Sequence, residues 1–72
     1  MSTILIIEDE PELVKVLRSY LEQAGFTVLS ALRGDSGLNT WEQKRPDLVI
    51  LDLNLPGMDG LDVARAIRRK AD

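Results

Sequence analysis

The sequence predicts an α/β fold in which three parallel strands alternate with three helices. Apolar runs at Thr3–Ile7 and Leu48–Leu53 show little polar alternation, which is typical of strands covered on both faces of a parallel sheet. The segments between the expected strands carry apolar residues at helical spacing, with charged residues on the opposite side. Because strands and helices alternate along the chain, we expect right-handed crossovers and a parallel sheet.

Composition excludes several classes of protein. The 72 residues suffice for one domain at most, and the lack of cysteine excludes a disulfide framework and a thiolate metal site. The lack of histidine removes the usual zinc ligands, a serine–histidine nucleophile and an internal phosphohistidine donor. A net charge of −3 gives no reason to expect nucleic-acid binding. No apolar run approaches the ~20 residues of a membrane span and no signal peptide is visible, so we expect a soluble cytoplasmic protein without membrane contact.

The first strand and helix follow a regular pattern. The strand Thr3–Ile7 ends in three consecutive acids, Glu8–Glu10. The proline that follows suits the first turn of a helix, where its missing N–H costs nothing. We expect this helix over Pro11–Ala24, with Gly25 just beyond its end and with Tyr20 as a packing residue rather than a cofactor contact.

The second strand and helix carry weaker signals. Phe26–Ala31 is shorter and more polar than the first strand, as an edge strand would be. We expect Arg33–Ser36 to form a loop that caps a second helix, which reaches Lys44. Leu38 and Trp41 form the apolar pair of that helix, and Trp41 is expected to pack in the core. Three residues there are poor helix formers, namely Gly37, Asn39 and Thr40.

The third strand, expected over Leu48–Leu53, contains a carboxylate. Asp52 is costly to desolvate inside such a strand unless something pairs with it. We therefore expect it near the carboxyl end of the strand, where open α/β sheets carry their chemistry. The third helix begins with Asp59 as its N-cap and Asp62 in a capping-box position. It ends in the basic run Arg68–Lys70, which we interpret as a solvated helix end matched to the helix dipole.

The order of the strands decides which side chains meet. Order 3-2-1 would place the polar second strand in the middle of the sheet, whereas order 2-1-3 places the apolar first strand there, and we prefer the second. In that order the end of the first strand lies beside the end of the third. Because neighbouring strands lie about 4.8 Å apart, Glu8, Asp9 and Asp52 are expected to converge.

Three carboxylates at one sheet edge repel each other, and a hard divalent cation relieves the repulsion. Magnesium prefers oxygen ligands, so Asp9 and Asp52 are candidate direct ligands, Glu8 a ligand through water, and Asn54 a donor of its backbone carbonyl. Such a cation would let Asp52 act as a nucleophile toward a phosphoryl group and form an acyl phosphate. The alternative is that Asp9–Pro11 is a helix-start cluster favoured by the helix dipole.

The preferred order leaves the third strand at an edge, although its composition is that of a central strand. The sequence therefore resembles the first part of a longer doubly wound domain, and residues 1–72 are interpreted as a partial domain. We expect the open edge of the third strand, with the uncovered faces of Ile50 and Leu53, to pair with another molecule and to form a homo-oligomer.

Two segments identify a family. Ile4–Pro11 and Pro46–Gly60 strongly resemble the receiver domain of bacterial two-component response regulators, and the resemblance covers essentially the whole chain. Its specific part is an acidic pair after the first strand together with Asp-x-x-x-Pro-Gly-Met-Asp-Gly after the third. The resemblance implies a flavodoxin-like (CheY-like) three-layer fold of five strand–helix units in the order 2-1-3-4-5.

The same resemblance implies a function. It implies that Asp52 is a phosphoacceptor that takes a phosphoryl group from a sensor histidine kinase, and that the domain is not an enzyme in the ordinary sense. Glu8 and Asp9 match the magnesium-binding acids of the family, and Asn54 matches the position whose main-chain oxygen completes the site. The amino-acid sequence of the third-strand segment looks most like that of transcription regulators that carry a winged-helix DNA-binding output domain.

This sequence departs from the family in length. Family members run to roughly 120 residues, a common domain size, whereas three of the five units are present here. We expect a chain truncated after its third helix, without strands 4 and 5 or an output domain. The strand-4 Ser/Thr and strand-5 Lys that contact the phosphoryl group would then be missing, so phosphorylation of Asp52 is expected to be impaired.

Two other functions are compatible with the pattern. The chain could be a non-functional or engineered half-domain that assembles through its exposed sheet edge. A haloacid-dehalogenase-like phosphatase fragment also uses a nucleophilic Asp after an apolar strand. That family needs a second acid two residues later, where this chain has Asn54, and its motif normally lies on the first strand. A dinucleotide-binding fold is disfavoured because Glu8–Glu10 replaces the glycine-rich turn.

Overall fold

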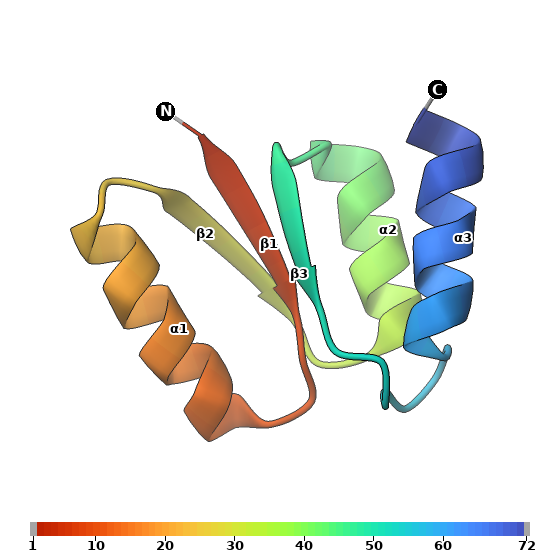
Figure 1. Cartoon of the computed structure of the whole chain (residues 1–72), viewed down its shortest axis with the longest axis horizontal. Coiled ribbons are helices and arrows are strands. Elements are labelled where there is room, and N and C mark those ends of the chain that lie inside the picture. The colour runs from red at the N-terminus through yellow and green to blue at the C-terminus, as the bar shows by residue number, and fades with distance from the viewer. Residues whose placement is uncertain (1, 72) are drawn as a thin grey trace.

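The computed structural model describes residues 2–71 and confirms an α/β fold whose three strands are parallel in the order β2-β1-β3. Figure 1 shows α1 on one face of the sheet and α2 and α3 together on the other, which makes three layers. The elements are β1 (Thr3–Ile7), α1 (Pro11–Gln23), β2 (Thr27–Ala31), α2 (Gly34–Lys44), β3 (Leu48–Leu51) and α3 (Gly60–Ala71).

The central strand β1 is buried on both faces, as its uninterrupted apolar run predicts. Leu5 and Ile7 point to the face covered by α2 and α3, where they pack with Trp41 and Val63. Ile6 points to the opposite face and packs beneath α1, together with buried side chains of α1 and β2. Alternate residues of one strand thus supply two separate cores, because successive side chains of a strand point to opposite faces.

The boundaries of two elements differ from the sequence prediction. The strand β3 ends at Leu51 rather than at Leu53, because the chain turns away after the Asp52 N–H has donated to the Ile7 carbonyl at 3.0 Å. The segment Arg33–Ser36 is not a loop throughout. The helix α2 already begins at Gly34, and the Gly37 N–H donates to the Arg33 carbonyl at 2.9 Å.

The sequence predicts the positions of some other side chains correctly and those of others wrongly. Trp41 is confirmed as a packing residue, with 5% of its surface exposed, whereas the same prediction for Tyr20 is wrong, because it lies 71% exposed on the outer side of α1. Asp59 is confirmed as the N-cap of α3, since its Oδ1 accepts the Leu61 N–H at 3.0 Å. Asp62 forms an ion pair with Arg65 at 3.5 Å instead of a capping-box bond.

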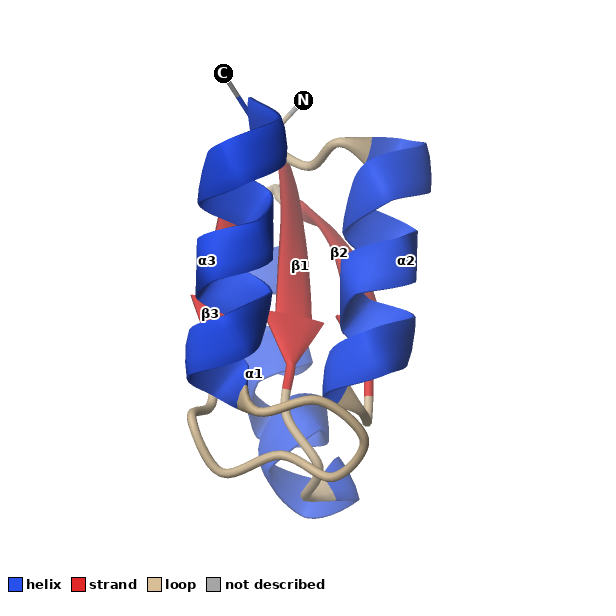
Figure 2. Cartoon of the chain, turned by 90° about the vertical axis from the view of Figure 1, so that its right-hand side faces the viewer, coloured by secondary structure: helices blue, strands red, loops and turns tan. Residues whose placement is uncertain are grey.

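The basic end of α3 is exposed, as expected from the sequence. Its Lys70 also joins α3 to α2 through an ion pair with Glu42 at 2.6 Å. Figure 2 shows these two helices side by side in front of the sheet, with loops that lead from strands into helices gathered at one end. Within residues 2–71, no helix combines the length and the hydropathy that crossing a bilayer requires.

A glycine is required where α2 crosses β1. A Cβ at position 37 would lie 2.7 to 2.9 Å from three carbons of Ile7, a side chain with no exposed surface. Overpacking a core typically costs about 1–3 kcal/mol, which exceeds the gain of about 1 kcal/mol from replacing a helical glycine by alanine.

We therefore predict that Gly37→Ala lowers the free energy of unfolding by about 1 kcal/mol, the difference between these two effects. Asn39→Ala, at an exposed position of the same helix, serves as the control and is expected to raise stability by a few tenths of a kcal/mol. Urea denaturation monitored by circular dichroism measures both. A stabilised Gly37→Ala variant would show that the Ile7 side chain moves aside at little cost.

Candidate metal centre

Three carboxylates gather where β1 and β3 end. Oxygen atoms of Glu8, Asp9 and Asp52, which together we name the acidic site, lie within 4.8 Å of one another. The convergence that strand order 2-1-3 predicts is therefore present. The register explains it, because Ile7 pairs with Leu51 and the residues that follow each of them come next to each other.

Backbone hydrogen bonds hold the acidic site on both sides of β1. The Glu8 N–H donates to the Ala31 carbonyl at 3.0 Å, which ties the end of β1 to β2. The Asp52 N–H donates to the Ile7 carbonyl at 3.0 Å, which ties β3 to β1. Glu8 and Asp52 thus start from backbone that the sheet fixes, so these two carboxylates cannot move apart freely to relieve their repulsion.

The surroundings of Glu8 disfavour its charged form. Its side chain is 9% exposed, and burial is the main reason why the pKa of its carboxyl is raised above the usual range. The nearby Asp52 and Asp9 raise the pKa of Glu8 further, while a hydrogen bond from the Glu10 N–H to its Oε2, 3.1 Å long, opposes the rise. Within residues 2–71, no Lys or Arg lies within 4.0 Å of a carboxylate oxygen of the acidic site.

The chain after Asp52 folds back beside it. The Asn54 N–H donates to Asp52 Oδ1 at 3.3 Å, so Asn54 lies at the acidic site with its side chain exposed. The Gly60 N–H donates to the Leu53 carbonyl at 3.2 Å and closes the loop of residues 52–60. Asn54 is therefore fixed to the phosphoacceptor candidate by its own backbone, while its role as a ligand stays a prediction.

Two glycines that support this loop were not singled out from the sequence as site residues. A Cβ at position 60 would overlap the Asp52 carbonyl and lie 2.6 Å from Leu53 Cα. A Cβ at position 34 would overlap the Met58 carbonyl. Each of these glycines is the first residue of a helix, a position at which helix capping does not require glycine. A glycine there therefore indicates a close approach of backbone. Both glycines permit backbone to pack on backbone next to the acidic site.

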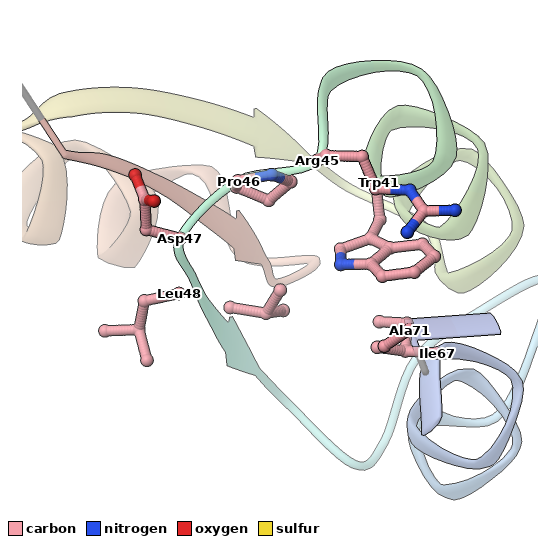
Figure 3. Close-up of a pocket in the computed structure, with 8 residues that line it drawn as sticks. Trp41, Arg45, Pro46, Asp47, Leu48, Ile67 and Ala71 are labelled. Atoms are coloured by element: carbon pink, nitrogen blue, oxygen red, sulfur yellow. The ribbon is translucent and has the colours of Figure 1, made fainter. Parts of the chain in front are cut away.

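A hollow in the surface lies away from the acidic site. Figure 3 shows it where α2 ends and β3 begins, at the opposite end of β3 from Asp52. The Arg45 guanidinium stacks on the Trp41 ring there, 4.1 Å from its centroid. The hollow shares no residue with the acidic site, and its one carboxylate, Asp47, accepts the Thr3 N–H at 2.7 Å. The candidate chemistry therefore rests on the acidic site alone.

The acidic site suits a hard divalent cation. Its donors are carboxylate oxygens, which Mg²⁺ prefers, and they lie close enough together to share one ion. Burial first, and then the neighbouring acids, raise the pKa of Glu8, so its charged form is disfavoured when no cation is bound. A bound dication would offset that cost, and Asp9, which is exposed, and Asp52, which is partly exposed, leave an approach from solvent.

Comparison with protein families gives an independent result. Residues 4–72 match the model of the response regulator receiver domain. The chain is 48% identical over 69 residues to the transcriptional regulatory protein BaeR of Escherichia coli, and 42% identical over 69 residues to AfsQ1 of Streptomyces coelicolor. Each match covers 96% of this chain, and the chain spans 29% and 31% of the length of these two relatives.

Solved structures agree with the family match. The response regulator TrrA of Thermotoga maritima, in complex with Mg²⁺ and BeF, superimposes with a TM-score of 0.93 at 38% identity over 97% of this chain and 61% of TrrA. TrrA bound to the histidine kinase ThkA gives a TM-score of 0.90, covering 60% of that chain. The flavodoxin-like fold is thereby confirmed. The chain belongs to the response regulator receiver domain family.

Proposed function

We propose that this chain is a phosphoacceptor domain of a two-component system, in which Asp52 receives a phosphoryl group in a magnesium-dependent reaction. The observation that carries the proposal is the gathering of Glu8 and Asp9 around Asp52 within 4.8 Å, with the backbone of Glu8 and Asp52 fixed by the sheet. The domain is an acceptor in this reaction rather than an enzyme that acts on a separate substrate.

Each residue has a defined part in the proposed reaction. A carboxylate oxygen of Asp52 forms a bond to phosphorus as the bond between phosphorus and the donor's leaving group breaks. Glu8, Asp9 and Asp52, with the backbone carbonyl of Asn54, would hold Mg²⁺. When bound, the ion neutralises charge on the transferring phosphoryl group. The Asn54 N–H bonded to Asp52 Oδ1 keeps that carboxylate oriented toward the site.

The proposed partner is a sensor histidine kinase. Support comes from TrrA, a relative in structure, which has been crystallised with the histidine kinase ThkA. BaeR and AfsQ1 are transcriptional regulatory proteins, which supports a role in transcription regulation. The proposal places the protein in the cytoplasm, since regulators of transcription act where the DNA is. Direct DNA binding by these 72 residues is not part of the proposal.

We further propose that residues 1–72 are part of a receiver domain and that phosphorylation of this chain is slow. Family members compared above are longer, since the chain covers 60% or 61% of the TrrA chains. The described residues bring no Lys or Arg into ion-pair distance of the acidic site. Removing one group that stabilises transition-state charge typically costs about 10²- to 10³-fold in rate.

Incubation with acetyl phosphate and MgCl₂ is expected to add one phosphoryl group, detected by intact-mass spectrometry, and Asp52→Asn is expected to abolish the addition. The control is Asp62→Asn, an exposed acid on α3, which should leave the modification unchanged. EDTA should suppress it. Full modification of Asp52→Asn would contradict Asp52 as the acceptor, and complete modification of the unaltered chain within minutes would contradict the slow rate.

A second prediction concerns pH. The folded pKa of Glu8 is raised, so the folded state binds this proton more tightly than the unfolded state, and stability falls as pH rises toward and through the folded pKa. Without metal at pH 7, Glu8→Gln is therefore expected to stabilise the fold, because a buried carboxylate beside two acids is replaced by a neutral amide of similar size.

Mg²⁺ binding should respond in the opposite direction. The cation must displace the Glu8 proton, so affinity should fall as pH drops through the raised pKa, and Glu8→Gln should weaken binding and flatten its pH dependence. Thermal melts and Mg²⁺ titrations between pH 4.5 and 8 measure both effects, with the exposed Glu12→Gln as control. A Glu8→Gln variant that is destabilised and binds Mg²⁺ normally contradicts this account.

The two edges of the sheet differ, because in the described part of the chain only the β2 edge is covered by a side chain. For this 72-residue chain in solution we propose, as an alternative, a role in assembly through the other edge. Arg18 covers the β2 edge, because its Nη1 donates to the Val28 carbonyl at 3.1 Å and its Nη2 to Ser30 Oγ at 3.0 Å. The β3 edge has no partner strand among residues 2–71, and Leu48 on it is 55% exposed. Two copies paired through β3 would form a closed homodimer.

Light scattering is expected to give a dimer for the unaltered chain and a monomer for Leu48→Lys, because a lysine on an edge strand opposes pairing. Arg18→Ala uncovers the β2 edge and should give larger, open-ended assemblies. Lys15→Ala, an exposed change on the same helix, should remain a dimer. A monodisperse monomer at millimolar concentration would exclude the β3 pairing.

A further inference from the structure

The loop of residues 52–60 rests on the start of α2. The Pro56 carbonyl accepts two N–H groups, from Gly34 at 3.0 Å and from Met58 at 3.0 Å. The bond from Met58 closes a tight turn centred on Gly57, whose φ of 82° lies in the region that favours glycine. The middle of the loop is therefore attached to α2, while its ends are attached to β1 and α3.

Two side chains at the start of α2 lie against this turn, one from Arg33 just before the helix and one from Asp35 in its first turn. A Cβ at Gly57 would lie 2.7 Å from both Arg33 Nη2 and Asp35 Oδ1. The same two side chains form a two-point ion pair, with Arg33 Nε to Asp35 Oδ1 at 3.0 Å and Arg33 Nη2 to Asp35 Oδ2 at 3.2 Å. Both members of the ion pair therefore lie next to Gly57.

The ion pair is also fixed to α2. Asp35 Oδ1 accepts the Ser36 N–H at 2.8 Å in the first turn of the helix. Arg33 holds the pKa of the Asp35 carboxyl below its usual range. Both side chains are about half exposed, at 53% and 55%, so the pair contributes little to global stability as an ion pair. What distinguishes it is its position against Gly57.

The turn is connected to the acidic site by a short stretch of chain. One residue, Leu55, separates Asn54 from Pro56, and the Asn54 N–H is bonded to Asp52 Oδ1. A shift of the Gly57 turn therefore moves the backbone that carries the Asn54 carbonyl. No contact of Arg33 or Asp35 with the acidic site is needed for this effect, because the loop transmits it.

We propose that the Arg33–Asp35 pair positions the loop of residues 52–60 for divalent-cation binding at the acidic site. This inference rests on the proposed function, since it takes Asn54 to complete the cation site. Removal of either partner leaves the Gly57 turn unsupported on one side. The loop then samples positions in which the Asn54 carbonyl is farther from the acids, and the affinity for Mg²⁺ falls.

The test is an Mg²⁺ titration followed by the amide NMR signals of Asn54 and Gly57. Arg33→Ala and Asp35→Ala are each expected to weaken Mg²⁺ binding about 3-fold, which corresponds to the free energy that an exposed ion pair typically contributes. The double variant should bind no more weakly than either single variant, because both changes remove the same support. Melting temperatures in EDTA should stay within about 2 °C, as for ordinary surface changes.

Arg65→Ala is the matched control, because Arg65 forms an exposed ion pair with Asp62 on α3 and does not touch Gly57. It should bind Mg²⁺ like the unaltered chain. If Arg33→Ala and Asp35→Ala match this control, the positioning role is overturned while the proposed function stands. Additive losses, or losses that follow a lower melting temperature, also overturn it. No Mg²⁺ binding by the unaltered chain overturns both proposals.

Discussion

The parallel pairing of Ile7 with Leu51 is the constraint on which the acidic site depends. Once those two residues are in register, Glu8 and Asp52 must follow side by side, and repulsion between their carboxylates cannot separate them without breaking backbone hydrogen bonds to Ile7 and Ala31. The apolar core stabilises that register, because Leu5 and Ile7 pack under α2 and α3 while their neighbour Ile6 packs under α1. The energy of burying β1 thus holds charges together that would separate in water.

Three glycines permit the close contacts that hold the loop next to the acidic site. At positions 34 and 60 the backbone of one element approaches another so closely that a Cβ would overlap a carbonyl oxygen. At position 57 the turn needs a positive φ and also lies against the Arg33–Asp35 pair. In the loop of residues 52–60, Leu55 and Met58 pack against the core but are only partly buried, so the close backbone approaches add to side-chain packing there.

The sequence predicts the fold and the meeting of the acids, because both follow from local signals. Apolar runs identify β1 and β3, the polar character of Phe26–Ala31 identifies an edge, and acids directly after two strands must converge once the order is 2-1-3. The end of β3 and the start of α2 depend instead on hydrogen bonds to distant residues, namely Asp52 to Ile7 and Gly34 to Pro56. The exposure of Tyr20 depends on what α1 packs against, which helical periodicity alone does not specify. Candidate roles of the acids in Mg²⁺ binding and phosphoryl transfer follow from their convergence, whereas the histidine kinase as phosphoryl donor comes from the family resemblance.

Charge explains why cation binding and phosphoryl transfer should place different demands on this chain. Three ionised carboxylates with one dication carry a net charge of about −1, which carboxylate and water ligands accommodate well. Phosphorylation of Asp52 replaces a single negative charge by nearly two, so the loaded site becomes more negative by about one unit. Within residues 2–71 no lysine or arginine forms an ion pair with the acidic site to offset that addition. The described residues therefore provide the features that attract a cation, and they leave the added phosphoryl charge without a positive side chain of their own.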